Sequence, residues 1–156
     1  MKLHLIRHAK TLQAKRDEND FDRHLAEKGI RQAKALSDYL NPKNINSEVW
    51  CSEATRTKET LVILQNKCSL EKIEFSKDLY LCSTKTFLEK LWRDDSAEDL
   101  IIVGHNFWIS DLASYFTDED IELRTGEYIC IDFGKYTRNE TSSGLGKLID
   151  RWRYKE

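Results

Sequence analysis

Arginine and histidine stand side by side at the end of the first apolar run of the chain. Residues 3–6 are mainly apolar, which predicts a short buried strand, and Arg7-His8 follows directly. In open α/β sheets, ligands bind just beyond the carboxyl ends of the strands. A neutral imidazole next to a guanidinium there would combine a nucleophile with an anion-binding group. Taken alone, such a pair is more often a hydrogen-bonded histidine beside a surface ion pair.

Similar side chains follow two further apolar runs. Arg56 comes shortly after the second run, and His105 ends the most apolar run of the chain, while Arg23 lies in a polar stretch after the first run. Carboxyl ends of parallel strands open on one edge of a sheet, so these residues and Arg7-His8 would line one pocket that suits a dianionic phosphoryl group. Taken singly, Arg56 also fits a solvated basic face, because Lys58 is close by.

The apolar spacing along the chain predicts strands that alternate with helices. This alternation is typical of a mostly parallel sheet covered on both faces. We therefore expect an α/β fold, a three-layer sandwich with an antiparallel hairpin on the sheet edge, formed as one domain over residues 1–156. The predicted strands are 3–6, 47–51, 73–75, 100–103, 127–133 and 147–152. The predicted helices are 27–40, 53–67 with Ser52 as N-cap, 84–92 with Ser83 or Thr84 as N-cap, and 107–116.

Composition argues against several classes of function. A net charge of −2 over 156 residues argues against a general affinity for nucleic acid or acidic membranes. The four cysteines are widely spaced and form no CxxC pair, as expected of free thiols in a reducing compartment. Charged residues interrupt the N-terminal apolar run, so it is too short for a signal peptide, and no run approaches the length of a membrane span. We therefore expect a cytoplasmic protein.

Five blocks of the sequence combine charged, polar and glycine residues in a recognisable order. The blocks are Arg7-His8-Ala9-Lys10-Thr11; Asp22-Arg23-His24-Leu25 with Gly29, Arg31, Gln32 and Ala33; Ser52 to Thr60; Leu79-Tyr80; and Val103-Gly104-His105-Asn106. In this order they resemble the histidine phosphatase (phosphoglycerate mutase-like) superfamily, whose RHG signature is similar to the first block. The first block reads RHA-K, which is similar to the small bacterial branch typified by the SixA phosphohistidine phosphatases. Each block is weak by itself, but the ordered set is specific and spans nearly the whole chain.

The resemblance implies a role for each matching residue. His8 would be the nucleophile that becomes transiently phosphorylated, and neighbouring guanidinium charges would keep it neutral near pH 7. The phosphoryl oxygens would be bound by Arg7, Arg56, His105 and, in this branch, Arg23. Phosphoryl transfer needs mainly positioning and charge stabilisation, so we expect neither a metal nor another cofactor. The partner would be a phosphorylated protein or a small phosphorylated compound.

The interval before the last histidine block bears on the choice of substrate. Longer members of the superfamily resemble this chain but carry an extra helical segment there, with a glutamate as general acid. Here the interval has room for one strand and one helix, and its acids read as solvated positions: Glu71, Glu74, Asp78, Glu89, Asp94, Asp95, Glu98 and Asp99. A phosphorylated imidazole needs no such donor, because its second nitrogen can already carry a proton. We therefore expect phosphohistidine on a protein as substrate; if alkyl esters react as fast, Glu53 or Asp22 is the first candidate acid.

Departures from the family pattern leave other interpretations open. Glu53 and His24 stand where the family has proline, and Phe107-Trp108 replace Pro-Gly. The alternatives are a small-molecule phosphomonoester phosphatase and a non-catalytic module that binds phosphate or phosphohistidine with the same arginines. A further alternative is a metal site formed by His4, His8, His24 and His105. The spacing of four residues between His4 and His8 aligns ligands on a helix but not on a strand.

Overall fold

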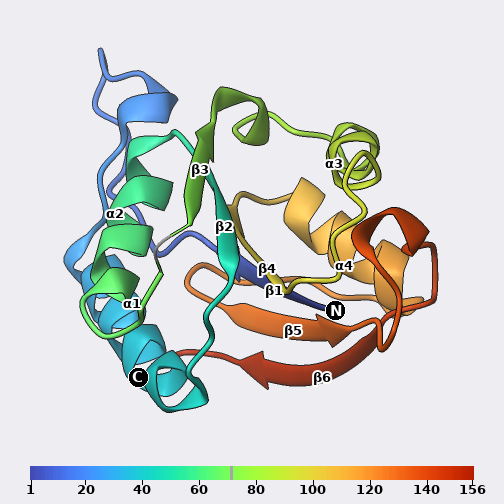
Figure 1. The fold of residues 1–156 in the computed structure, drawn as a ribbon. Helices are drawn as coiled ribbons and strands as arrows, with labels where there is room; N and C mark the ends of the chain where they lie inside the picture. The colour runs from blue at the N-terminus through green and yellow to red at the C-terminus, as the bar shows by residue number, and fades with distance from the viewer. Residues whose placement is uncertain (71) are drawn as a thin grey trace.

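A mixed six-stranded sheet forms the centre of the computed structural model, which describes residues 1–70 and 72–156 (Figure 1). The strand order is β3-β2-β4-β1-β5-β6, and β5 runs antiparallel to β1 and β6 while the other neighbours are parallel. The strands are β1 (Lys2–Arg7), β2 (Glu48–Ser52), β3 (Ile73–Ser76), β4 (Leu100–Gly104), β5 (Tyr128–Asp132) and β6 (Lys147–Trp152). Glu71, one of the candidate acids considered above, lies outside the described residues.

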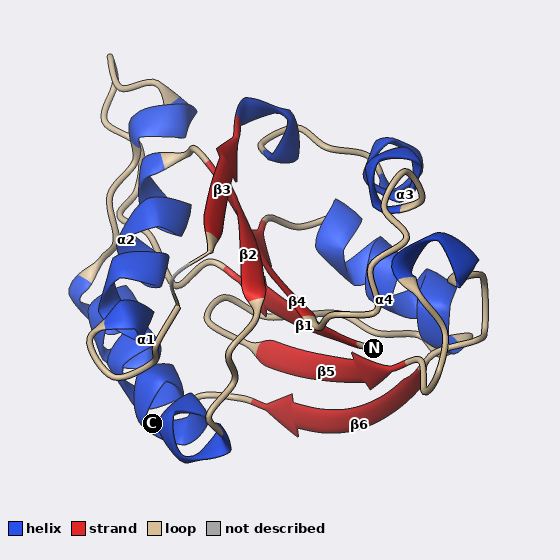
Figure 2. Ribbon diagram, in the orientation of Figure 1, coloured by secondary structure: helices blue, strands red, loops and turns tan. Residues whose placement is uncertain are grey.

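Helices cover both faces of this sheet (Figure 2). One face carries α1 (Glu27–Leu40) and α2 (Thr55–Gln65), and the other carries α3 (Thr84–Leu91) and α4 (Trp108–Thr117). The expected three-layer α/β sandwich, mostly parallel with an antiparallel edge hairpin, is therefore confirmed. Within the described residues, no helix has both the length and the apolar character needed to cross a membrane.

Alternate residues of β1 belong to two separate cores, because successive side chains of a strand point to opposite faces. Leu3 and Leu5 are fully buried in the core beneath α3 and α4, whereas Ile6 is buried in the core beneath α1 and α2. Burying one such side chain stabilises the fold by about 1.5–3 kcal/mol. The strand is thus fixed from both sides, and the residues that follow it start from a rigid position.

One predicted helix boundary is wrong. Ser52 does not cap α2; it is the last residue of β2, and the N-cap is Ala54, which makes no side-chain capping bond. The strand continues to Ser52 because its partner on β3, Ser76, extends the parallel ladder by one more residue. Ser83, by contrast, caps α3 as expected, and its hydroxyl accepts a hydrogen bond from the backbone N–H of Thr86 at 3.1 Å.

Candidate active site

Three adjacent strands bring most of the predicted residues to one edge of the sheet. β2, β4 and β1 are neighbours and run parallel, so their carboxyl ends open on the same edge. His8 directly follows β1, and His105 directly follows β4. Arg56 lies in the first turn of α2, shortly after the end of β2. Sequence segments that are about fifty residues apart therefore meet in one place, as expected.

The imidazole of His8 is buried and held in one tautomer. Its Nδ1 lies 2.8 Å from the carbonyl oxygen of Ala9, and since a carbonyl oxygen can only accept, Nδ1 carries the proton. Nε2 therefore keeps its lone pair, and Nε of Arg56 donates to it at 3.3 Å. The lone pair of His8 thus faces the guanidinium of Arg56.

Burial is the main reason that His8 is neutral. It lowers the pKa of His8 to about 3, and the charges of Arg56, Arg7 and Arg23 act in the same direction while the Ala9 carbonyl opposes them. The sequence suggested that the arginines would suppress protonation, whereas the structure assigns the largest effect to the loss of solvent. The ring consequently holds a free electron pair at neutral pH.

The ring of His105 lies beside that of His8, with 5.1 Å between the ring centroids. Its Nε2 is 2.8 Å from the hydroxyl of Ser52, which also accepts the backbone N–H of Ala54 at 3.3 Å. Among the described residues, the Ser52 O–H has no other acceptor, so it donates to Nε2, which leaves the His105 proton on Nδ1. Burial, followed by the neighbouring His8 and Arg56, lowers the pKa of His105 to about 2. The neutral ring can thus donate one hydrogen bond through Nδ1.

Asp20 joins the arginines, although nothing in the sequence pattern singled it out. Arg56 donates from Nη1 to the backbone carbonyl of Asp20 at 2.6 Å and from Nη2 to its carboxylate at 3.0 Å. Arg23 donates to the same carboxylate at 2.8 Å, and the hydroxyl of Tyr80 donates to it at 2.6 Å. These bonds, with that from Tyr80 as the largest contribution, hold the pKa of Asp20 well below its usual range. The carboxylate is therefore ionised.

Arg7 connects the site to the loop that precedes β5. Its Nη1 donates to the carbonyl of Leu123 at 2.8 Å, and the backbone N–H of Gly126 donates to the carbonyls of Arg7 and His8 at 3.1 and 3.0 Å. Among the described residues, two buried donors here have no acceptor: Nε of Arg7 and Nδ1 of His105. An unsatisfied buried donor costs about 1–3 kcal/mol. A ligand with acceptor oxygens would remove that cost.

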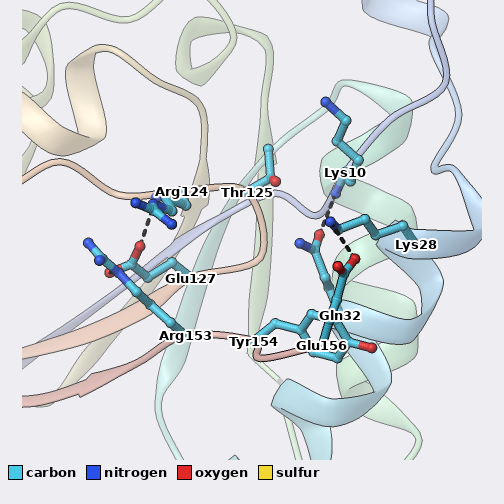
Figure 3. Close-up of a pocket in the computed structure, with 9 residues that line it drawn as sticks. All are labelled: Lys10, Lys28, Gln32, Arg124, Thr125, Glu127, Arg153, Tyr154 and Glu156. Carbon is cyan, nitrogen blue, oxygen red and sulfur yellow. Dashed lines mark hydrogen bonds and ion pairs between the residues drawn. The ribbon is translucent and has the colours of Figure 1, made fainter.

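A separate hollow of about 340 Å³ lies behind the same loop (Figure 3). Glu127 on its wall is buried and accepts hydrogen bonds from the side chains of Arg151 and Arg153, and its backbone carbonyl accepts the N–H of Arg7 at 3.1 Å. The hollow is lined by Lys10, Lys28, Gln32, Arg124, Thr125, Glu127, Arg153, Tyr154 and Glu156. The lining does not include His8, His105, Arg7, Arg23 or Arg56, so the hollow is separate from the paired histidines.

The other two histidines lie elsewhere. His4 is buried within β1, with Nδ1 2.9 Å from the hydroxyl of Tyr128, and His24 is exposed, with its ring 2.6 Å from the carboxylate of Glu59. Within residues 1–70 and 72–156, no group of three or more His, Cys, Asp or Glu side chains is arranged to hold a metal ion. The alternative of a four-histidine metal site is therefore not supported.

The residues that replace the family's prolines and glycine make specific contacts. The backbone N–H of Glu53 donates to the carbonyl of Ser76 at 3.2 Å, a bond that proline could not make. Trp108 is buried against Gly104, where an added Cβ would lie 2.5 Å from the indole ring. Phe107, in contrast, is 81% exposed. The replacements thus leave the paired histidines in place and alter the rim.

Three contributors to the site were missed by sequence reasoning. Ser52 was assigned to helix capping, whereas it binds His105. Asp20 lies in a polar stretch without periodicity, and Tyr80 was noted for its place in a family block alone. Tyr80 also packs edge-on against the ring of His105, with 5.5 Å between centroids. A signal for Asp20 was its spacing of three residues from Arg23, a distance at which opposite charges meet in one turn.

We expect the protein to lose stability on mild acidification, because burial holds three histidines neutral. The pKa values of His4, His8 and His105 are lowered from 6.5 to about 4, 3 and 2. Below pH 6.5 the unfolded chain therefore binds more protons than the folded protein, and stability falls as the pH falls towards these values. Each histidine changes the free energy of unfolding by at most about 1.4 kcal/mol per pH unit.

Denaturant unfolding at pH 7.5 and 5.5 measures this effect. The free energy of unfolding should be lower at pH 5.5, and His4→Gln, whose side chain is neutral at both pH values, should make the difference smaller. Equal free energies of unfolding at the two pH values would show that the histidines are not buried as described.

The family model for the histidine phosphatase superfamily (branch 1) matches residues 3–80, and the chain belongs to this superfamily. No curated protein matches the chain.

Solved structures of similar proteins cover nearly the whole chain. A candidate phosphohistidine phosphatase SixA from Agrobacterium tumefaciens is 22% identical, with a TM-score of 0.84 over 98% of this chain and 97% of that one. The protein histidine phosphatase SixA complexed with tungstate is 16% identical, with a TM-score of 0.80 over 97% and 96%. A candidate α-ribazole-5′-phosphate phosphatase from Escherichia coli is 18% identical, with a TM-score of 0.70 over 92% and 96%. At such identities the likeness establishes the fold.

Proposed function

We propose that this protein is a metal-independent phosphatase that removes phosphate from phosphohistidine on a protein. The observation that carries the proposal is a pair of buried donors that have no acceptor among the described residues, Nε of Arg7 and Nδ1 of His105, beside the free lone pair of His8. A phosphoryl group supplies acceptor oxygens for both donors and an electrophilic phosphorus for the lone pair. Membership of the histidine phosphatase superfamily agrees with this chemistry.

The proposed reaction has two transfers. Nε2 of His8 attacks phosphorus, the bond from phosphorus to the leaving group breaks, and the leaving group takes the electron pair. Water then attacks the phosphorylated His8, which releases inorganic phosphate and restores the neutral ring. Arg7, Arg56 and His105 would hold the three equatorial oxygens while their charge is redistributed, which is the main requirement of phosphoryl transfer.

The charge state of the site favours a leaving group that needs no acid. Among the described residues, the carboxylate that contacts the arginines is Asp20, and its low pKa prevents it from donating a proton. Neither earlier candidate acid, Asp22 or Glu53, has a side-chain hydrogen bond to the paired histidines or arginines. An alkoxide would leave unprotonated, whereas an imidazole protonated on its second nitrogen leaves as a neutral ring.

The rim of the site supports a protein as the partner. Leu81, which follows Tyr80, is 84% exposed, and Phe107, which lies two residues after His105, is 81% exposed. The rings of Tyr80 and His105 are in contact, so these two exposed apolar residues belong to segments that meet at the site. Exposed apolar groups around a polar centre are typical of protein interaction surfaces.

A substrate panel tests the proposed function. We expect a phosphohistidine peptide and a free phosphoramidate to be hydrolysed about 10²–10⁴-fold faster than an alkyl phosphate ester, because that factor is what a general acid usually contributes. An aryl phosphate, whose leaving group is stable as an anion, should fall between them. Initial rates at one pH, with and without EDTA, measure both the preference and the independence from metal.

A small-molecule phosphomonoesterase is the second candidate function. It is favoured by the likeness of the fold to a structure named for an α-ribazole-5′-phosphate phosphatase. Equal rates on a sugar phosphate and on the phosphohistidine peptide would support this candidate and overturn the first. Activity that is lost in EDTA and restored by zinc or magnesium would overturn the metal-free reaction.

A further inference from the structure

We propose that Asp20 is a positioning residue, which directs the guanidinium of Arg56 at the reacting nitrogen of His8 and limits how tightly the site holds an oxyanion. This inference rests on the proposed function, because it assigns Arg56 to the transferring phosphoryl group. Asp20 lies in the short 3-10 turn Asp20–Asp22, in the segment between β1 and α1. It therefore acts on the strand-end residues from a loop.

The contacts of Arg56 show how its orientation is set. A guanidinium carries five N–H groups in a fixed plane. One on Nη1 and one on Nη2 are directed to Asp20, at 2.6 and 3.0 Å, while Nε points at Nε2 of His8. These three bonds fix the orientation of the guanidinium plane. One N–H on Nη1 and one on Nη2 are left for a phosphoryl oxygen.

Asp20 also fixes the surroundings of Arg56. Arg23 donates to Oδ1 of the carboxylate, and Tyr80 donates to Oδ2, the oxygen that Arg56 also contacts. The ring of Tyr80 lies against the guanidinium, 5.5 Å from its carbon, and against the ring of His105. One carboxylate therefore links both arginines to the aromatic ring that covers the second histidine.

The same carboxylate reduces the positive charge that an oxyanion meets. Arg23 and Arg56 carry two positive charges, of which Asp20 offsets one in direct contact. Removing that charge would free N–H groups of both arginines for the oxyanion in its ground state. It would also release Arg56 from its direction towards His8, which matters most in the transition state.

Asp20→Asn separates these two effects, because asparagine keeps the size of the side chain but loses the charge and one acceptor oxygen. We expect kcat on a phosphoramidate to fall about 10–100-fold, since a small misplacement of a catalytic group costs that much. We expect the Kd of inorganic phosphate, measured by calorimetry, to fall about fivefold, since one nearby negative charge is lost.

The matched control is Asp22→Asn, in the same turn and with the same change of charge. Asp22 is exposed and has no ion pair or side-chain hydrogen bond with other described residues, so both kcat and the phosphate Kd should stay at the wild-type values. A double-mutant cycle identifies the route of the effect: in an Arg56→Ala background, Asp20→Asn should lower kcat no further. Added formate should restore part of the activity of Asp20→Ala, even if that variant is less stable.

Failure of this inference and failure of the proposed function give different results. A wild-type protein that binds phosphate but hydrolyses no phosphoramidate would overturn the proposed function. In that case, a lower Kd of phosphate in Asp20→Asn would still support the effect of the Asp20 charge on binding. Unchanged kcat and Kd in Asp20→Asn, in a wild-type protein that is active, overturn the inference alone. Weaker phosphate binding together with a lower melting temperature and no rescue by formate would show that Asp20 only supports the fold.

Discussion

Replacing His8 by alanine should abolish phosphatase turnover, with kcat reduced by at least about 10³-fold. The reason is that Nε2 of His8 is the group that forms the covalent bond to phosphorus, and no arginine or neutral histidine nearby can take over that bond without moving. In the wild-type protein, brief incubation with labelled phosphoramidate followed by a quench without acid should leave label on His8. Peptide mapping under alkaline conditions locates the label.

His24→Ala is the matched control for this substitution. His24 is exposed and pairs with Glu59, so its loss should leave kcat within about twofold of the wild type. Two other nucleophilic side chains nearby should stay unlabelled. Burial raises the pKa of Cys51 to about 12, and the hydroxyl of Ser52 is hydrogen-bonded to His105. Label on either of these residues would contradict the role of His8.

Most of the fold could be predicted from the sequence, because the apolar period directly reflects burial. The run of Leu100 to Val103 is buried on both faces in the structure, and the spacing of Ala33, Leu36 and Leu40 places one face of α1 on the sheet. Ile30 shares that spacing but is 38% exposed, since it lies at the margin of the buried face. Periodicity thus locates elements better than it locates their edges.

The paired strand-end residues could be predicted for a different reason. His8 and His105 each lie two residues after the end of an apolar run, so parallel strands are enough to bring them together. Asp20 could not be predicted in this way, because its position depends on how a loop without apolar period folds over the sheet edge. Its contacts join residues 36 and 60 positions away along the chain. Such long-range loop contacts leave little trace in local sequence patterns.

The protonation of the site likewise depends on tertiary structure. The sequence showed arginines near His8, and these do lower its pKa, but burial contributes more. Burial at a strand end depends on how closely the following loops cover it, which a residue pattern does not specify. The tautomer depends on a single backbone carbonyl, that of Ala9. Both features are needed before a histidine can be assigned as a nucleophile.

Replacing Arg56 should give the second large loss of activity, and the size of the loss should depend on the replacement. Arg56 is buried, donates to Nε2 of His8 and is held by Asp20, so it is in place before substrate arrives. Arg56→Ala should lower kcat by about 10³–10⁴-fold, a range found when a cation that stabilises the transferring phosphoryl group is removed. Arg56→Lys keeps the charge and should lose less, although lysine cannot reproduce the planar fork.

Tungstate or vanadate inhibition gives a second measurement of the same residue, because these oxyanions imitate the transferring phosphoryl group. Inhibition should be competitive in the wild type, and the inhibition constant should rise more in Arg56→Ala than in Arg56→Lys. Lys58→Ala is the control, since Lys58 is exposed on the same helix and should affect neither kcat nor inhibition. Equal losses in the alanine and lysine variants would mean that the geometry of the fork, and not the charge, carries the contribution of Arg56. An Arg56→Ala variant with wild-type kcat would remove the arginine from the reaction altogether.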